Sequence, residues 1–119
     1  MFVPDIRLSR QSLEILAVMI EGRDEDLHGR LIGKRAGVSS GTLFPALARL
    51  EGAGWISSRE EDGDPAELGR PLQRIYNLTG PGETAARKEI AKLAAVLNRA
   101  LDAEAFPRRL GQAPAQGLI

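Results

Sequence analysis

Leucines recur at helical spacing in residues 39–54, and this segment organises the rest of the chain. Leu43, Leu47 and Leu50 occupy positions i, i+4 and i+7, which is the spacing of one buried stripe on an α-helix. Serine, glycine and threonine precede the stripe and can cap a helix N-terminus. Gly54 can end the helix in a left-handed conformation. The pattern predicts an amphipathic helix with an exposed, hydroxyl-rich beginning.

Pro45 lies close to the start of this helix. Proline removes one hydrogen bond from a helix interior but is tolerated in the first turn. We therefore expect the regular helix to begin near Thr42, or its first turn to be irregular, with residues 39–42 exposed. Such an end can bind a phosphate backbone or enter a DNA major groove. The alternative is a core helix with an ordinary cap.

Two further helices are predicted before this segment. Ser9 is a suitable N-cap for a helix over residues 10–21, which is apolar on two sides and so needs two covers. One face holds Leu13, Leu16, Ala17 and Ile20, and the other holds Ile15, Val18 and Met19. We expect the domain core to cover one face and a second subunit to cover the other. Residues 27–35 form a short second helix, and the glycine-containing turn 36–38 completes a helix-turn-helix pattern.

Two strands follow the central helix. Residues 55–59 and 74–78 alternate as strands, and the polar, turn-rich segment between them predicts a hairpin wing. Its loop is acidic, which is unexpected for a tip that faces DNA; the carboxylates are Glu60, Glu61, Asp62, Asp64 and Glu67. Trp55 is interpreted as a core residue at the junction of helix and wing, or as one wall of a ligand pocket.

A long helix is predicted after the wing, capped by Thr79 and running from Glu83 to about Glu104. Its apolar residues are spaced 4, 3, 4 and 3, as in a short heptad seam; they are Ala86, Ile90, Leu93, Leu97 and Ala100. The seam favours dimerisation, with packing on its own domain as the alternative. The predicted division is an arm (1–8), a winged helix-turn-helix domain (9–79), a dimerisation helix (80–105) and a loose tail (106–119), with Pro107 ending the helix.

Composition narrows the function. The chain has 119 residues, a length typical of one domain, with 16 basic and 16 acidic residues. Zero net charge argues against coating nucleic acid by bulk charge, yet four basic residues and one acidic residue in segment 27–54 leave a local excess of +3. No cysteine and a single histidine, His28, argue against a metal site or a thiolate nucleophile. His28 is interpreted as a packing or capping residue. We expect no membrane span, no signal peptide and a cytoplasmic location.

Four motifs resemble the PadR-like family of bacterial winged-helix transcriptional regulators. They are Leu27-His28-Gly29, Ser40-Gly41-Thr42-Leu43-Phe44-Pro45-Ala46-Leu47 followed by Arg49-Leu50-Glu51, Gly69-Arg70-Pro71, and Tyr76-Asn77-Leu78-Thr79. The resemblance implies a mainly α fold with a small β-hairpin and a C-terminal dimerisation helix. It also implies repression relieved by a small aromatic or hydrophobic effector.

The chain departs from that family pattern at three places. Arg30 stands where the family commonly has an aromatic residue, and Phe44 stands where it commonly has tyrosine, so a hydroxyl able to reach a phosphate is absent. Leu72 and Gln73 replace basic residues after the Gly-Arg-Pro motif. The last two departures weaken the expected backbone contacts but leave the fold unchanged.

We therefore predict a dimeric DNA-binding regulator that acts on an inverted-repeat operator, without cofactor, metal or catalytic residues. Phosphate or base-edge contacts are expected at the helix entry and phosphate neutralisation by nearby cations. The predicted DNA-binding residues are Ser39, Ser40, Thr42, Phe44, Lys34, Arg35, Arg49 and Arg70. The predicted dimerisation residues are Ile90, Leu93, Leu97, Leu101, Ile15 and Met19. The rival classes are a winged-helix protein-interaction module, similar to an antirepressor, and an enzyme, which would have to rely on carboxylates that are not clustered on an apolar face.

Overall fold

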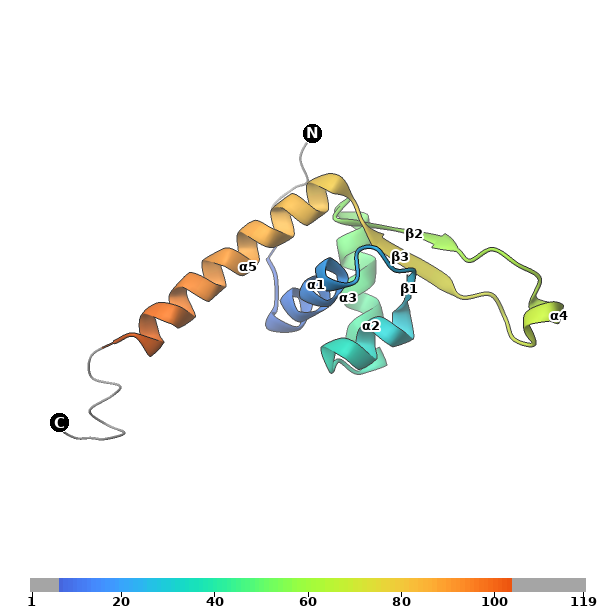
Figure 1. Ribbon diagram of the computed structural model, residues 1–119, viewed down its shortest axis with the longest axis horizontal. Helices are drawn as coiled ribbons and strands as arrows, with labels where there is room; N and C mark the ends of the chain where they lie inside the picture. Colours follow the sequence, from blue (N-terminus) through green and yellow to red (C-terminus); the bar gives the residue numbers. More distant parts are fainter. Residues whose placement is uncertain (1–6, 104–119) are drawn as a thin grey trace. The chain divides into compact units, whose positions relative to one another are not determined.

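The computed structural model describes residues 7–103 and holds five helices and three strands within them (Figure 1). In chain order these are α1 (Arg10–Glu21), β1 (Leu27–His28), α2 (Gly29–Ala36), α3 (Ser40–Gly52), β2 (Ile56–Glu60), α4 (Pro65–Leu68), β3 (Arg74–Leu78) and α5 (Gly80–Leu101). The chain forms two compact units that meet between Arg87 and Lys88. Most of the predicted N-terminal arm, the predicted end of the last helix near Glu104, Pro107 and the C-terminal tail lie outside the described residues.

A three-stranded antiparallel sheet has the order β1–β3–β2. The predicted hairpin is β2 and β3, in which Ile56 pairs with Leu78. The expected start of the second helix at Leu27 is wrong, because Leu27 is a buried strand residue that pairs with Tyr76. Helix α2 begins at Gly29, and His28 is its N-cap: its Nδ1 accepts a hydrogen bond from the Leu31 N–H at 3.3 Å. The capping role predicted for His28 is confirmed.

Helices α1, α2 and α3 pack beside the sheet around one core, and α4 lies at the far end of the β2–β3 hairpin (Figure 1). The stripe predicted for α3 is buried, since Leu43, Leu47 and Leu50 are each 1% exposed. Trp55 is 2% exposed and belongs to the core, as predicted.

The two faces of α1 are used differently from the expectation. Ile15 and Met19, predicted to meet a second subunit, are 0% and 1% exposed and lie in the chain's own core. The reason is that α1 contacts α2, α3 and β3 on that side. On the other face, which was expected to lie in the core, Leu16 is buried and Ile20 packs against the core, while Leu13 and Ala17 are half-buried.

Helix α3 begins at Ser40, two residues before the expected regular start. The Ser39 carbonyl accepts from both the Thr42 N–H at 3.1 Å and the Leu43 N–H at 2.8 Å, a shared hydrogen bond that is common at helix ends. Pro45 lies inside the helix. The N–H that proline lacks would have bonded the carbonyl of Gly41, an exposed residue whose carbonyl water can satisfy.

Glycine at position 33 lets α2 and α3 approach closely. A Cβ atom there would lie 2.9 Å from Leu43 Cδ2 and 3.0 Å from the Val38 carbonyl oxygen. Gly37 then ends α2 in the left-handed conformation, with φ of 68°. The helix-turn-helix corner therefore depends on two glycines with different tasks, close packing at 33 and the turn at 37.

Helix α5 begins at Gly80, three residues earlier than expected, because Thr79 caps it directly. The Thr79 Oγ1 accepts from the Gly82 N–H at 2.9 Å and donates to the Gly54 carbonyl at 2.7 Å. A Cβ atom at Gly82 would lie 1.8 Å from the Trp55 carbonyl oxygen, so only glycine fits there. The start of α5, the end of α3 and the start of β2 thus meet at one joint.

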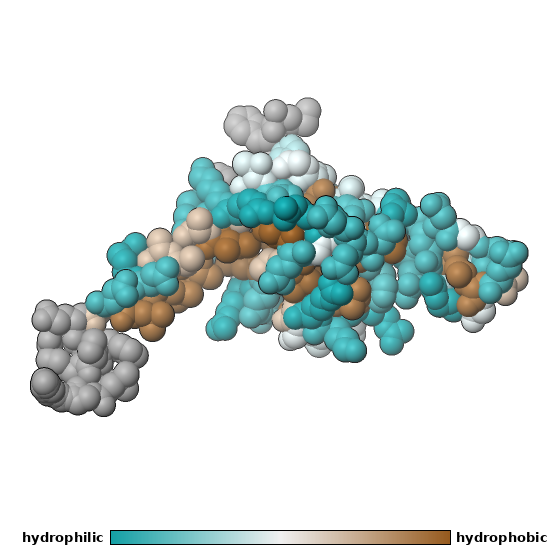
Figure 2. Space-filling model, in the orientation of Figure 1, coloured by the Kyte–Doolittle hydropathy of each residue, from teal (hydrophilic) through white to brown (hydrophobic). Residues whose placement is uncertain are grey.

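The second unit contains the part of α5 from residue 88 onward. Leu93, Leu97 and Leu101 are 39%, 53% and 59% exposed, and Figure 2 shows apolar residues gathered along one side of this segment. No helix among residues 7–103 is long and apolar enough to cross a membrane.

Candidate nucleic-acid interface

One long side of α3 faces solvent along its whole length. The residues exposed there are Ser40, Gly41, Thr42, Phe44, Pro45, Ala48, Arg49, Glu51 and Gly52. Gly41, Pro45 and Ala48 follow one another at spacings of four and three, which places them along the centre of this side. Thr42 and Arg49 flank the centre on one edge, and Phe44 flanks it on the other. The centre carries no side chain that forms hydrogen bonds, and the polar side chains lie at its margins.

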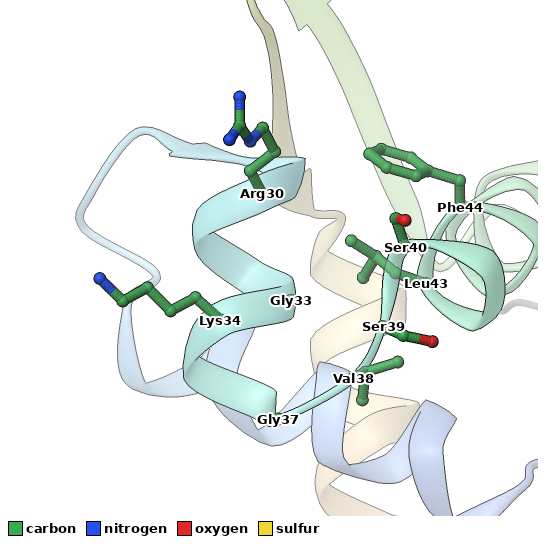
Figure 3. Close-up of a pocket in the computed structure, with 9 residues that line it drawn as sticks. All are labelled: Arg30, Gly33, Lys34, Gly37, Val38, Ser39, Ser40, Leu43 and Phe44. Atoms are coloured by element: carbon green, nitrogen blue, oxygen red, sulfur yellow. The ribbon is translucent and has the colours of Figure 1, made fainter.

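An open cleft of about 380 Å³ lies between α2 and the beginning of α3 (Figure 3). Arg30 and Lys34 line it from α2, while Ser39, Ser40 and Phe44 line it from the α3 side. Ser39 is the N-cap residue of α3, yet its side chain makes no capping hydrogen bond. Its hydroxyl can therefore bind an external group beside the partial positive charge of the helix N-terminus.

A second, smaller cleft of about 170 Å³ lies on the other side of Phe44. It is lined by His28, Gly29, Arg30, Phe44, Gln73, Arg74 and Tyr76. The ring of Phe44 comes so close to α2 that a Cβ at Gly29 would lie 2.7 Å from it. Burial raises the pKa of the Tyr76 phenol, so this side chain stays neutral at physiological pH. Phe44, 43% exposed, thus separates two clefts that share Arg30 as a lining residue.

Three cations beside α3 are unpaired. Arg30, Lys34 and Arg49 form no ion pair and no side-chain hydrogen bond with any residue from 7 to 103. Arg30 was not among the residues predicted to bind DNA. Its position one turn before Lys34 on the same helix is the sequence signal that marks it, because residues i and i+4 share a helix face.

Arg35, in contrast, is engaged within the protein. Its guanidinium donates to both carboxylate oxygens of Glu25, each at 3.1 Å. The hydrogen bond from Arg35 lowers the pKa of Glu25, so the pair stays ionised at neutral pH. Contact between Arg35 and DNA would require this pair to open.

Arg70 is engaged in the same way at the base of the wing tip. It forms a two-pronged ion pair with Glu61, in which Arg70 Nη2 lies 3.2 Å from Glu61 Oε2. The hydrogen bond from Arg70, followed by one from the Gln73 backbone, lowers the pKa of Glu61 to about 2. Arg59 on β2 is likewise paired, with Asp26 at 2.9 Å.

The structure thus sorts the predicted DNA-binding residues into three groups. Lys34, Ser39, Ser40 and Phe44 come together around one cleft. Thr42 and Arg49 are exposed on α3 outside that cleft, while Arg35 and Arg70 are held in ion pairs. Their contacts with DNA stay predictions. Within residues 7–103 no three His, Asp or Glu side chains are grouped so that they could hold a metal ion.

Comparisons with known proteins identify the fold. No protein-family model and no curated protein matches the sequence. Among solved structures, the chain is similar to the PcaV transcriptional regulator of Streptomyces coelicolor, with a TM-score of 0.64 and 21% identity over 77% of this chain and 61% of that one. It is similar to ZitR of Lactococcus lactis, described as a zinc-responsive MarR family member, with a TM-score of 0.61 and 17% identity over 83% and 62%.

A PadR-like transcription factor from Bacteroides fragilis is also similar, with a TM-score of 0.57 and 24% identity over 78% of this chain and 90% of that one. These likenesses show that the chain has the winged helix-turn-helix fold, as predicted. It spans about three fifths of the length of PcaV and ZitR. By length it corresponds more fully to the PadR-like factor.

Proposed function

We propose that this protein is a sequence-specific DNA-binding transcriptional regulator with α3 as its recognition helix. The observation that carries the proposal is the cleft between α2 and α3. There Arg30 and Lys34, which form no ion pair within residues 7–103, line the cleft from α2, and Ser39, whose side chain makes no capping hydrogen bond, lines it at the start of α3. Cationic side chains and the N–H groups of a helix N-terminus both bind phosphate. The winged-helix fold supports the same reading, because such folds place this helix in the major groove.

The exposed residues of this region have different proposed roles in DNA binding, which follow from the length and charge of their side chains. Arg30, Lys34 and Arg49 neutralise phosphates, since long cationic side chains reach the backbone from a helix edge. The hydroxyls of Ser39, Ser40 and Thr42 contact phosphates or base edges, and the ring of Phe44 offers an apolar surface to a thymine methyl group.

The salt dependence of DNA affinity tests whether the protein binds DNA through phosphate contacts. Fluorescence anisotropy with a labelled duplex should show affinity falling as salt rises, because bound phosphates release counterions. If about four to six phosphates are neutralised per dimer, log K should fall against log salt with a slope near −4 to −5. The zero net charge of the chain removes bulk attraction as the cause. A slope near zero, with no retention on heparin at low salt, would favour the protein-interaction module, which the acidic wing also supports.

Single substitutions test the division of labour. Lys34→Ala and Arg49→Ala should weaken binding to every sequence alike, whereas Ser40→Ala and Thr42→Ala should narrow the gap between operator and random DNA. Equal losses on both kinds of DNA for all four variants would contradict the assignment. The operator is best sought as an inverted repeat in the DNA that borders the gene.

We further propose that the protein acts as a homodimer through α5. Leu93, Leu97 and Leu101 follow one another every four residues and are at least 39% exposed, with Ile90 continuing the stripe. Burying a leucine contributes about 1.5–3 kcal/mol, and each contact counts twice in a symmetric pair. Leu13 and Ala17 on α1, both half-buried, replace Ile15 and Met19 as candidate dimer contacts outside α5, because the latter two are core residues.

Leu97→Asp tests the dimer, with Ala95→Asp as the matched control. Both add one carboxylate to an exposed position of the same helix, but residue 95 lies opposite the leucine stripe. Sedimentation should give dimers for the wild type and Ala95→Asp, and monomers at micromolar concentration for Leu97→Asp. Operator affinity should collapse only for the latter, because two recognition helices about 34 Å apart are needed to read both half-sites. A monomeric wild type would contradict the proposal.

The narrower assignment is to the PadR-like regulators, and the motif from Ser40 to Leu47 supports it. With that assignment we propose a cytoplasmic repressor, relieved by a small aromatic or hydrophobic effector. The solved structures named above are of transcription regulators, and we propose no catalytic activity. Release of a bound operator duplex by an effector of this class, measured by the same anisotropy assay, tests the regulatory part of the proposal.

A further inference from the structure

An ion pair between Arg70 and Glu61 lies where β2 and β3 part and the tip loop begins. Glu61 directly follows β2, and Gln73 directly precedes β3. Arg70 returns from the tip, after α4, and its guanidinium binds both oxygens of the Glu61 carboxylate. A second contact of the same guanidinium, to the Pro71 carbonyl at 3.1 Å, fixes its direction.

Glu61 is held in place independently of Arg70. Its N–H donates to the Gln73 carbonyl at 2.8 Å, and the Gln73 N–H donates to its Oε1 at 2.7 Å. The carboxylate therefore stays at this position whether or not Arg70 is bound. The hydrogen bond from Arg70, followed by that from the Gln73 N–H, lowers the pKa of this carboxyl to about 2, so it is ionised throughout the physiological range. Arg70 faces a permanent, fixed anion.

We propose that Glu61 occupies Arg70 in place of a DNA phosphate and so keeps the contribution of the wing to DNA affinity low. This inference rests on the proposed function. A carboxylate and a phosphate bind the guanidinium fork by the same two-pronged geometry, so the two anions compete for one cation. Arg70 can bind a DNA phosphate only when its ion pair with Glu61 opens.

This role differs from general repulsion by an acidic loop. Glu60 and Asp62 lie on either side of Glu61 and form no ion pair and no side-chain hydrogen bond within residues 7–103. They add negative charge near DNA without occupying a cation. Neutralising one of them changes the net charge as much as neutralising Glu61 does, but it frees no arginine to bind phosphate.

The test is therefore Glu61→Gln, with Glu60→Gln as the control of equal charge. Binding is measured by anisotropy on a labelled 30-base-pair duplex of random sequence, at about 50 mM and about 200 mM salt. Glu61→Gln should tighten binding about five- to tenfold at the lower salt, and its salt slope should steepen by about 1 for each protomer that gains a phosphate contact. Glu60→Gln should change affinity about twofold or less, as expected for one screened surface charge.

Arg70→Ala, made in the wild type and in Glu61→Gln, completes a double-mutant cycle. In the wild type it should change affinity less than about twofold, because the cation makes no phosphate contact, whereas in Glu61→Gln it should abolish the entire gain. Equal tightening by Glu60→Gln and Glu61→Gln, or equal loss from Arg70→Ala in both backgrounds, overturns the inference while leaving DNA binding intact. Absence of any salt-dependent binding by the wild type overturns the proposed function itself.

A measurement on the unaltered chain guards against a disturbed wing in Glu61→Gln. The Nε–Hε resonance of Arg70, assigned by ¹⁵N NMR through its loss in Arg70→Ala, should keep its position when the duplex is added. The corresponding signal of Arg30 should shift. A large shift of the Arg70 signal in the wild type would overturn the inference, because it would mean that the cation exchanges Glu61 for phosphate.

Discussion

The α2–α3 corner and the wing carry similar numbers of cations but use them differently. At the corner, Arg30 and Lys34 face an open cleft and have no anionic partner among the described residues. At the wing, Arg59 pairs with Asp26 and Arg70 pairs with Glu61, while Arg74 donates a hydrogen bond to Ser58 Oγ at 3.0 Å. The charge of a segment therefore does not measure its attraction for phosphate. What decides is whether each cation must first leave an anion of its own protein.

This difference has a direct energetic meaning. A phosphate that binds an unpaired cation replaces water and mobile ions, whereas one that binds a paired cation must displace a fixed carboxylate and leave it near the polyanion. The local excess of +3 predicted from sequence counted Arg35 as equal to Lys34. In the folded chain, Arg35 is held by Glu25 through two hydrogen bonds.

The largest loss of DNA affinity is expected when the unpaired cations of the α2–α3 corner are removed. Arg30→Ala combined with Lys34→Ala should lower DNA affinity about 100-fold near 0.1 M salt, because each protomer loses two phosphate contacts. Arg35→Ala combined with Arg59→Ala removes the same charge from paired positions and should cost only a few-fold. The two double variants are compared by anisotropy on one duplex. Similar losses would mean that net charge, rather than pairing, controls binding.

A smaller effect is expected from a substitution that shifts α2 relative to α3 without changing the charge of the corner. Gly33→Ala places a methyl group 2.9 Å from Leu43 Cδ2 and 3.0 Å from a backbone oxygen, so α2 must shift relative to α3. The free energy of unfolding should fall by about 1–3 kcal/mol, partly offset by the better helix propensity of alanine. Affinity for DNA should fall as well, since Arg30 and Lys34 move with α2.

Gly41→Ala is the control for that variant, because nothing lies within 4 Å of a Cβ placed there. Its unfolding free energy should equal that of the wild type or rise by up to about 1 kcal/mol, because alanine has the better helix propensity. Thermal melting with a reversible two-state transition measures both variants. If Gly33→Ala were as stable as Gly41→Ala, the close approach of the two helices would not matter for the fold.

The smallest effect concerns the wing and depends on pH. The folded-state pKa of Glu61, about 2, lies below its usual value near 4.5. Its ion pair therefore adds stability that is fully present above pH 4.5 and is lost as the pH falls toward 2. Glu61→Gln should melt at a lower temperature than the wild type at pH 7, and the difference should shrink below pH 4.5. A difference that stays constant down to pH 2.5 would show that the carboxylate charge does not stabilise the wing.

Much of the fold could be predicted from periodicity. The leucine stripe of α3, the two strands of the wing and the cap at Thr79 were predicted at or near their observed positions. Each depends on residues near one another in the sequence. The strand at Leu27 was missed because two residues are too few for an alternating pattern, and its pairing with Tyr76 is a contact between distant segments.

The candidate site was predictable in its chemistry but not in its electrostatics. Hydroxyls at the start of α3 and cations around it are visible in the sequence. The ion pair between Arg70 and Glu61 requires the tip loop to fold back on the hairpin, and Arg59 meets Asp26 from 33 residues away. The faces of α1 were misassigned for the same reason, since a helix that is apolar on two sides does not specify which side its own chain covers.

The bare centre of the exposed side of α3 has a consequence for how regulators of this kind diversify. Gly41 and Ala48 are exposed, and nothing lies within 4 Å of a Cβ at Gly41. Substitutions there can add a hydrogen-bonding side chain to the groove-facing surface without disturbing the core. Most mutations that create a new function cost stability, but exposed positions such as these lie outside the core, where substitutions usually change stability little. After gene duplication, one copy can acquire a new operator preference through changes at these two positions while the fold, the proposed dimer and the proposed phosphate contacts are inherited unchanged.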